Sequence, residues 1–174
     1  TAANHCASLG CEMDGLLRST ATLPASAFLR APDYLSASEV ATLPCAAVTA
    51  WAALLTRGGL IPGEHVLVQG TGGVAVFAVQ FAKAMGATVT VISSSDEKLH
   101  KIRQLGADHT VNYVEYPRWS DRVIELLGGE HIDLAIELGG AETLAQSLNC
   151  LRVGGRISVI GVLSGNEAQV VISD

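Results

Sequence analysis

From residue 64 onward, short runs of consecutive apolar residues alternate with segments whose apolar side chains recur at helical spacing. The apolar runs predict buried β-strands at residues 65–69, 88–92, 109–112, 132–138 and 156–160. The periodic segments predict helices at residues 74–85, 96–105, 121–127 and 142–151. Strands that alternate with helices in this way form right-handed βαβ units and a parallel sheet covered on both faces. The pattern therefore predicts an α/β fold with a doubly wound parallel sheet of about five strands.

The start of the chain lacks this alternation. Residues 1–35 hold only short strand-like pieces, at residues 15–19 and 27–30, and loops that contain prolines. These pieces offer no apolar face large enough for a core. We interpret this part as a remnant of a neighbouring domain.

Two helices are predicted between this remnant and the first strand. A capping box that opens at Ser36 predicts a helix that stops before Pro44, and a second helix is expected at residues 46–55. We therefore expect residues 1–45 to be a partial domain with its linker. Residues 46–174 are expected to be the sheet domain, with a last strand missing because such folds usually have about six strands.

Composition narrows the class of protein. Hydrophobic residues make up 49% of the 174 residues and charged residues 16%, which is enough for a packed core. The net charge of −6 argues against nucleic acid or an anionic membrane as the main partner. We find no secretory signal and no apolar run of the length needed to span a membrane. The four cysteines include no C-x-x-C pair, and we expect reduced thiols and a cytoplasmic location.

The strongest motif is the glycine-rich stretch GTGGVA, which directly follows the first predicted strand and opens a helix. Gly70 permits a tight turn, Gly72 removes a side chain where a pyrophosphate approaches, and Ala75 lets the helix pack closely on the strand. The helix start offers free N–H groups to phosphates. The alternative is a glycine-rich turn with no ligand. We predict a dinucleotide-binding Rossmann sheet, with cofactor contacts from Gly70, Thr71, Gly72, Gly73 and Val74.

The end of the second predicted strand bears on which dinucleotide binds. NAD-specific sites place Asp or Glu here to bind the ribose 2′-hydroxyl, whereas this chain has Ser93. A serine can hydrogen-bond to a 2′-phosphate, and Lys98 supplies positive charge. Ser94 also opens a capping box for the next helix, and the nearby Asp96 and Glu97 argue the other way. We expect NADP(H) to be favoured over NAD(H), with Ser93, Ser94 and Lys98 at the site.

Several segments resemble the medium-chain dehydrogenase/reductase superfamily. They are VLVQGTGGV, AKAMGATV, SSSDEKL, LGADHTVNY and VGGRISVIG, and the upstream stretches DGLLRSTATLPASAFLRAPDYLS and ATLPCAAVTAW. The resemblance covers nearly the whole chain. It is strongest for the zinc-type alcohol dehydrogenases and the quinone oxidoreductase-like enzymes. It identifies the first part as a remnant of the catalytic domain of that superfamily.

The resemblance implies further cofactor contacts. Thr49 matches a threonine that touches the nicotinamide, and Tyr113 and Lys98 match positions beside the adenosine ribose phosphate. Leu138, with Gly140, matches a ribose contact, and Gly161 and Val162 match backbone beside the nicotinamide. From the residues alone, Thr49 could bond to its own helix and Gly161 could be a simple strand-to-loop turn.

Cys45 is the candidate metal ligand. In zinc-dependent relatives a cysteine at this position is one of three catalytic zinc ligands, but the other two would lie before Thr1. A small buried thiol is the other interpretation. We expect no zinc, assign no metal ligand and no catalytic residue, and give Glu137, near a strand end, no catalytic role.

The function implied by the resemblance is hydride transfer between NADP(H) and a small-molecule carbonyl, alcohol or quinone. This chain would supply the cofactor-binding part of an incomplete enzyme, and the full-length protein would be a homodimer or tetramer. Three alternatives remain: a non-catalytic NAD(P)H-binding or redox-sensing module, a methyltransferase that uses S-adenosylmethionine, and a truncated dimerisation partner. Ser93 argues against the methyltransferase, which usually carries an acidic residue there.

Overall fold

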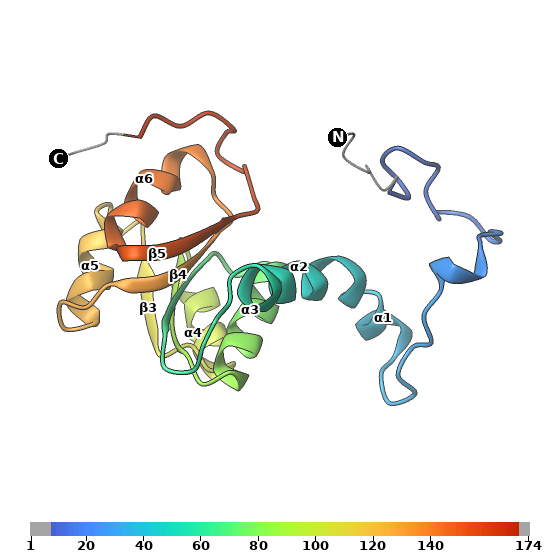
Figure 1. Ribbon diagram of the computed structural model, residues 1–174, viewed down its shortest axis with the longest axis horizontal. Coiled ribbons are helices and arrows are strands. Elements are labelled where there is room, and N and C mark those ends of the chain that lie inside the picture. Colours follow the sequence, from blue (N-terminus) through green and yellow to red (C-terminus); the bar gives the residue numbers. More distant parts are fainter. Residues whose placement is uncertain (1–7, 171–174) are drawn as a thin grey trace. The chain divides into compact units, whose positions relative to one another are not determined.

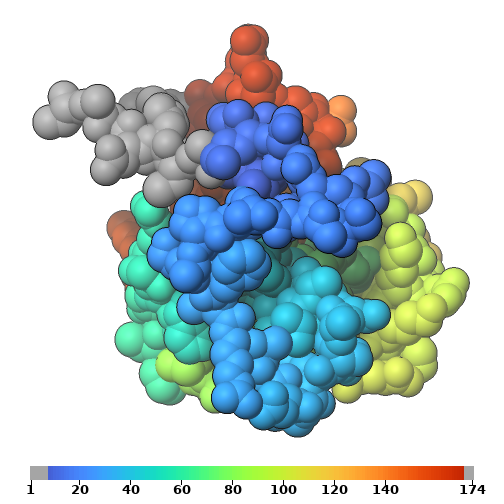
Figure 2. All heavy atoms as spheres, turned by 90° about the vertical axis from the view of Figure 1, so that its right-hand side faces the viewer, coloured from blue at the N-terminus to red at the C-terminus, as the bar shows by residue number. Residues whose placement is uncertain are grey.

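The computed structural model describes residues 8–170, and the chain divides into two units, Thr1–Ser36 and Ala37–Asp174. The division lies before the boundary expected after residue 45. Within residues 8–36 no side chain is buried, and the regular structure is a 3₁₀ turn at Ala25–Ala27 and one bridge between Leu9 and Met13. Figure 2 shows the atoms of this part in blue, and Figure 1 shows its backbone as a trace with little regular structure. The predicted strand-like pieces are not strands, because an extended segment needs a neighbouring strand to pair its backbone groups.

The second unit contains a five-stranded sheet in which every paired strand is parallel. Its order is β3-β2-β1-β4-β5, as in a Rossmann sheet. The strands are β1 His65–Gln69, β2 Thr88–Ser93, β3 His109–Asn112, β4 Ile132–Glu137 and β5 Leu151–Val159. The α/β prediction is confirmed. The fifth strand begins at Leu151, before the predicted residue 156, because Arg152, Val153 and Gly154 are exposed and, with two adjacent glycines, do not form a run of buried apolar residues.

Helices cover both faces of the sheet, as Figure 1 shows. They are α3 Gly73–Ala84, α4 Asp96–Gln104, α5 Trp119–Leu126 and α6 Ala141–Cys150. Alternate residues of β1 point to opposite faces: Val66 and Val68 pack in the core formed with α3 and α4, while Leu67 packs in the core with α5 and α6. All three are fully buried, which explains why the strands are continuous apolar runs.

A helical stretch from Ala37 to Thr56 precedes the sheet. It contains α1 Ala37–Val40, a π-helical turn at Leu43–Ala47, α2 Val48–Trp51 and a second π-helical turn at Ala52–Thr56. Its 20 residues have a mean hydropathy of 1.4, enough by length and composition alone to cross a membrane, whereas the sequence predicted no such segment. The helix of a packed domain meets the same two criteria, and here Trp51 makes an edge-to-face contact with Phe81 of α3, with ring centroids 5.6 Å apart.

Asp108 joins three elements at the edge of the sheet where the strands begin. Its carboxylate accepts hydrogen bonds from Lys83 Nζ at 2.8 Å and 3.0 Å and from the Val89 N–H at 2.7 Å. Burial raises the pKa of Asp108, but the bonds from Lys83 and Val89 outweigh burial, so that its pKa is lowered. The ionised side chain therefore stabilises the junction of α3, β2 and β3.

We expect Asp108→Asn to lower the free energy of unfolding at about pH 7 by about 1 kcal/mol, since the side chain is partly exposed. Because the folded-state pKa is lowered, this contribution is complete above the unfolded pKa of about 3.9 and is lost as the pH falls through the folded pKa. Urea unfolding at about pH 7 and about pH 2 measures it. A difference between variant and wild type that is the same at both values would contradict this account.

Candidate functional site

The candidate site lies at the carboxyl ends of the strands, between β1 and β4. From β1 the chain builds β2 and β3 on one side, and it then returns to place β4 and β5 on the other. Such a reversal leaves a crevice at the ends of the two central strands, where ligands of open α/β sheets bind. The glycine-rich turn follows β1 and therefore opens into this crevice.

The geometry of the turn fits a phosphate-containing ligand. Gly70 has a φ of +75°, which side chains rarely adopt, and its N–H donates to Ile92 O at 2.7 Å. Gly72 caps the start of α3 without any side-chain hydrogen bond. A Cβ built on Gly72 would meet nothing within 4 Å, so the backbone borders open space. The first amides of α3 thus face a cradle that any side chain at residue 72 would fill.

One groove of about 480 Å³ brings most of the predicted cofactor residues together. It is lined by the glycine turn, the end of β2, the start of α4 and the loops after β3, β4 and β5. The predicted residues that line it are Gly70, Thr71, Gly72, Gly73, Val74, Ser93, Ser94, Lys98, Tyr113, Leu138 and Gly161. Residues that lie far apart in the sequence therefore meet at one surface, as expected for a dinucleotide site.

The two acidic residues that follow β2 do not face the groove, although the sequence places them close to it. Ser95, and not Ser94, caps α4, since its Oγ accepts from the Lys98 N–H at 3.4 Å; the predicted capping box at Ser94 is wrong. Asp96 accepts a hydrogen bond from Asn112, and Glu97 is paired with Lys101 at 2.6 Å. Neither acidic residue lines the groove.

Serine and lysine are the polar side chains of this part of the groove. Ser93 is 5% exposed, Ser94 is exposed, and both line it. Within residues 8–170, Lys98 forms no ion pair, which leaves its ammonium group available at the edge of the groove. This set of hydrogen-bond donors can receive an anion.

Three of the predicted contacts, at Thr49, Gly140 and Val162, lie outside this groove. Thr49 lines a separate groove of about 460 Å³ between α2 and β5, together with Val48, Ile157 and other residues. Val162 is 56% exposed and does not line the main groove. Their contact with a cofactor was implied by the resemblance and stays a prediction.

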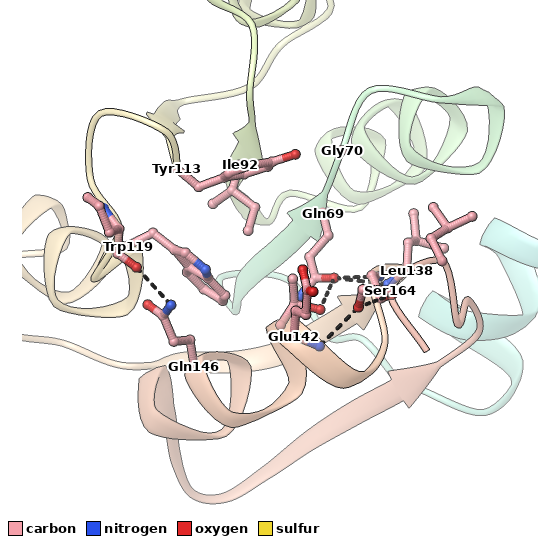
Figure 3. Close-up of a pocket in the computed structure, with 13 residues that line it drawn as sticks. Gln69, Gly70, Ile92, Tyr113, Trp119, Leu138, Glu142, Gln146 and Ser164 are labelled. Carbon is pink, nitrogen blue, oxygen red and sulfur yellow. Dashed lines mark hydrogen bonds between the residues drawn. The ribbon is translucent and has the colours of Figure 1, made fainter. Parts of the chain in front are cut away.

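A second hollow of about 460 Å³ adjoins the groove and contains residues that the sequence did not reveal (Figure 3). Ile92, Trp119 and Pro117 give it apolar walls. Gln146 of α6 links this helix to the segment that contains Pro117 and Ser120. Its Oε1 accepts a hydrogen bond from the Ser120 N–H at 3.1 Å, and its Nε2 donates to Pro117 O at 2.9 Å. A flat apolar ring with polar edges fits such a hollow. The only sequence signal was an aromatic residue just before a predicted helix.

Beneath the groove lies a buried polar cluster that sequence reasoning left without a role. Glu137, the last residue of β4, is fully buried and contacts Gln69, the last residue of β1, at 2.5 Å. Thr143 and Ser147 of α6 also donate to its carboxylate. The sequence pointed to this cluster only in that Gln69 and Glu137 are polar residues at the ends of two largely apolar strands.

The cysteines of the described residues are free thiols, and Cys6 lies outside those residues. Cys45, the candidate zinc ligand, is exposed. Burial raises the pKa of the Cys150 thiol to about 12, so it is not a thiolate at neutral pH. In residues 8–170 no group of three or more His, Cys, Asp or Glu side chains is placed to hold a metal ion. The expectation of a zinc-free protein stays a prediction.

The model of the zinc-binding dehydrogenase family matches residues 73–174, which begin at the last glycine of the glycine turn and include α3 and every later strand. The chain belongs to this family. It lies within the medium-chain dehydrogenase/reductase superfamily, as the motifs indicated. A zinc-type alcohol dehydrogenase-like protein from Schizosaccharomyces pombe is 50% identical over 164 residues, which are 93% of this chain and 47% of the relative.

Solved structures agree. A protein described as an alcohol dehydrogenase from Sinorhizobium meliloti 1021 is 48% identical with a TM-score of 0.89, over 95% of this chain and 48% of that one. An NAD-dependent alcohol dehydrogenase is 36% identical with a TM-score of 0.82, over 87% and 44%. A mycobacterial protein in complex with NADPH is 31% identical with a TM-score of 0.77, over 87% and 46%. The chain thus spans about half the length of these relatives.

Proposed function

We propose that the intact protein is an NADP(H)-dependent oxidoreductase of the alcohol dehydrogenase or quinone reductase type, and that this chain is its cofactor-binding part. The reaction is hydride transfer between the nicotinamide and a small-molecule carbonyl, alcohol or quinone. The single observation that carries the proposal is the open space at Gly72, in front of uncapped amides of α3 and at the reversal of the strand order. When bound, the nicotinamide supplies the hydride chemistry, and the protein binds and orients it.

The residues divide the work along the groove. The glycine turn binds the pyrophosphate through backbone N–H groups, and the apolar hollow beside Ile92 and Trp119 receives the adenine. Ser93 and Lys98 line the same groove as the glycine turn and bind the 2′-phosphate of the adenosine ribose. The other half of the dinucleotide extends toward the ends of β4 and β5, where Leu138 and Gly161 border it.

The preference for NADP(H) rests on the chemistry at the end of β2. A carboxylate there would repel a 2′-phosphate, whereas a serine hydroxyl and an unpaired lysine attract it. Both acidic residues that follow are held by other partners, as described above. Titration of the chain with NADPH and NADH, followed by tryptophan fluorescence, tests the proposal. Equal or tighter binding of NADH would overturn the preference, and no binding of either would overturn the function.

We expect Ser93→Asp to move the preference toward NADH. The new carboxylate repels the 2′-phosphate and can accept a hydrogen bond from a ribose 2′-hydroxyl. The ratio of the NADPH to the NADH dissociation constant should rise by about tenfold or more, which corresponds to about 1.4 kcal/mol. The same fluorescence titration measures both constants.

Glu97→Gln is the matched control for charge near this site. It changes one charge on the same segment but does not line the groove. Its ratio of dissociation constants should stay within about twofold of wild type, because exposed charges are screened. If Ser93→Asp keeps the wild-type ratio of the two dissociation constants, the end of β2 does not contact the 2′ substituent of the adenosine ribose.

A further inference from the structure

Glu142 places a carboxylate at the hollow that adjoins the groove. The residue lies in the first turn of α6 and is exposed. Its backbone N–H donates to Ser164 Oγ at 2.9 Å, whereas its side chain forms no hydrogen bond or ion pair with the residues that the structure describes. An ionised carboxylate only accepts hydrogen bonds. A ligand in the hollow therefore meets an acceptor that no protein group occupies.

Four other polar side chains around the hollow are held by the protein. The two amides are bonded at both their oxygen and their nitrogen, and the two hydroxyl groups donate to protein oxygens at 2.6 Å and 2.9 Å. These side chains are Gln69, Gln146, Thr143 and Ser164. They form a fixed wall and leave the hydrogen bonding of a ligand to their neighbours.

Trp119 offers a hydrogen-bond donor to the same hollow. The residue lines the hollow and is 3% exposed. Its indole N–H has no partner among residues 8–170, and the nitrogen is not fully buried, so it opens to the hollow. Figure 3 shows Trp119 and Glu142 on opposite sides of this space. A ligand between them can accept a hydrogen bond on one side and donate one on the other.

The place of these two residues decides which edge of a base they meet. Glu142 and Trp119 line the hollow but not the groove, whereas both spaces are bordered by Gln69, Gly70, Tyr113, Leu138 and Leu163. In the proposed function, on which this inference rests, the ribose and phosphates lie in the groove and the adenine in the hollow. The glycosidic nitrogen then faces the shared residues, and the opposite edge of the ring faces Glu142 and Trp119. That edge carries the 6-amino group, the hydrogen-bond donor of adenine, beside a ring nitrogen that accepts.

We propose that Glu142 is a specificity-determining residue for the base of the cofactor: its carboxylate accepts a hydrogen bond from the 6-amino group of adenine. The Trp119 N–H donates to a neighbouring ring nitrogen. A 6-oxopurine presents an acceptor oxygen at the same place, and the carboxylate repels it. Because Glu142 does not line the groove, its charge lies at the base and not at the phosphates.

A change of base tests the proposal on the wild-type chain. Dissociation constants are measured by isothermal titration calorimetry for NADPH and for its analogue that carries hypoxanthine in place of adenine. The analogue has an oxygen at the 6-position and a proton on the adjacent ring nitrogen, so it reverses both groups. We expect NADPH to bind at least about fivefold more tightly, since the bond to Glu142 is charge-assisted but exposed. Equal binding of the two dinucleotides would overturn the proposal.

Glu142→Ala removes the acceptor. The constant for NADPH should rise by about fivefold, while the constant for the hypoxanthine analogue stays or falls, because the analogue does not make the bond. If Glu142 only supported the fold of α6, both constants would rise together. That result, or no change in either constant, would contradict the inference.

Glu142→Gln exchanges the acceptor for an amide that can also donate to a 6-oxo group, so the preference for NADPH should vanish. A variant that keeps the full preference would overturn the proposal. The matched control is Glu115→Gln, which removes an exposed carboxylate that lines neither space and should keep the ratio of constants within about twofold. A change in this control as large as that in Glu142→Gln would show an effect of net charge and contradict the inference. Failure of the wild-type chain to bind either dinucleotide would instead refute the proposed function.

Discussion

Gly72→Val is expected to abolish tight binding of NADPH while leaving the chain folded. A side chain at residue 72 projects into open space in the groove, so it meets no protein atom but fills the place of the pyrophosphate. Loss of two charge-assisted hydrogen bonds to phosphate costs about 3 kcal/mol, or about 100-fold in the dissociation constant. The backbone of Gly72 is extended, with φ −79° and ψ −175°, which valine adopts readily. Fluorescence titration and urea unfolding measure the two effects.

Asp108→Asn is the control that separates binding from stability. It lies at the opposite edge of the sheet and is expected to lose stability without losing NADPH binding. The valine variant should show the reverse, with a change in unfolding free energy of at most about 1 kcal/mol for a poorer N-cap residue. If the Gly72→Val variant binds NADPH as tightly as wild type, the pyrophosphate does not bind at the glycine turn. The observation on which the proposed function rests would then be refuted.

The parts of the fold that follow from local sequence were predicted well. The first four strands begin at the predicted residues, and β1, β2 and β4 are largely apolar runs buried on both faces. The glycine turn was also readable, since Gly70 requires a positive φ and Gly72 borders open space. The family resemblance then placed Tyr113, Leu138 and Gly161 at the same groove, although they lie on three different loops.

Features that depend on tertiary neighbours were not predictable in the same way. Ser94 and Ser95 are equivalent as capping residues in the sequence, and only the turn after β2 decides between them. Gln146 is a polar residue on an amphipathic helix until α6 packs beside Pro117. The cluster of Glu137 needs β1, β4 and α6 to meet, and no spacing along the chain encodes that meeting.

Gly161, in the segment after β5, packs closely against the end of β4 and also lines the groove. A Cβ at Gly161 would lie 2.1 Å from Leu138 O and 2.8 Å from Leu138 C, both of them backbone atoms. The simple-turn interpretation of Gly161 is therefore insufficient: the residue is glycine because two strand ends touch. The same two residues line the groove on its β4 and β5 side.

Gly161→Ala is accordingly expected to lower the free energy of unfolding by about 2–3 kcal/mol, because the ends of β4 and β5 must separate to admit the methyl group. The separation also displaces the loop at Leu138, so NADPH binding should weaken by about tenfold. Urea unfolding and fluorescence titration measure both. The control is Val162→Ala at the next residue, whose exposed side chain should change stability by no more than about 0.5 kcal/mol. If Gly161→Ala were as stable as wild type, the ends of β4 and β5 would have to lie farther apart than in this structure.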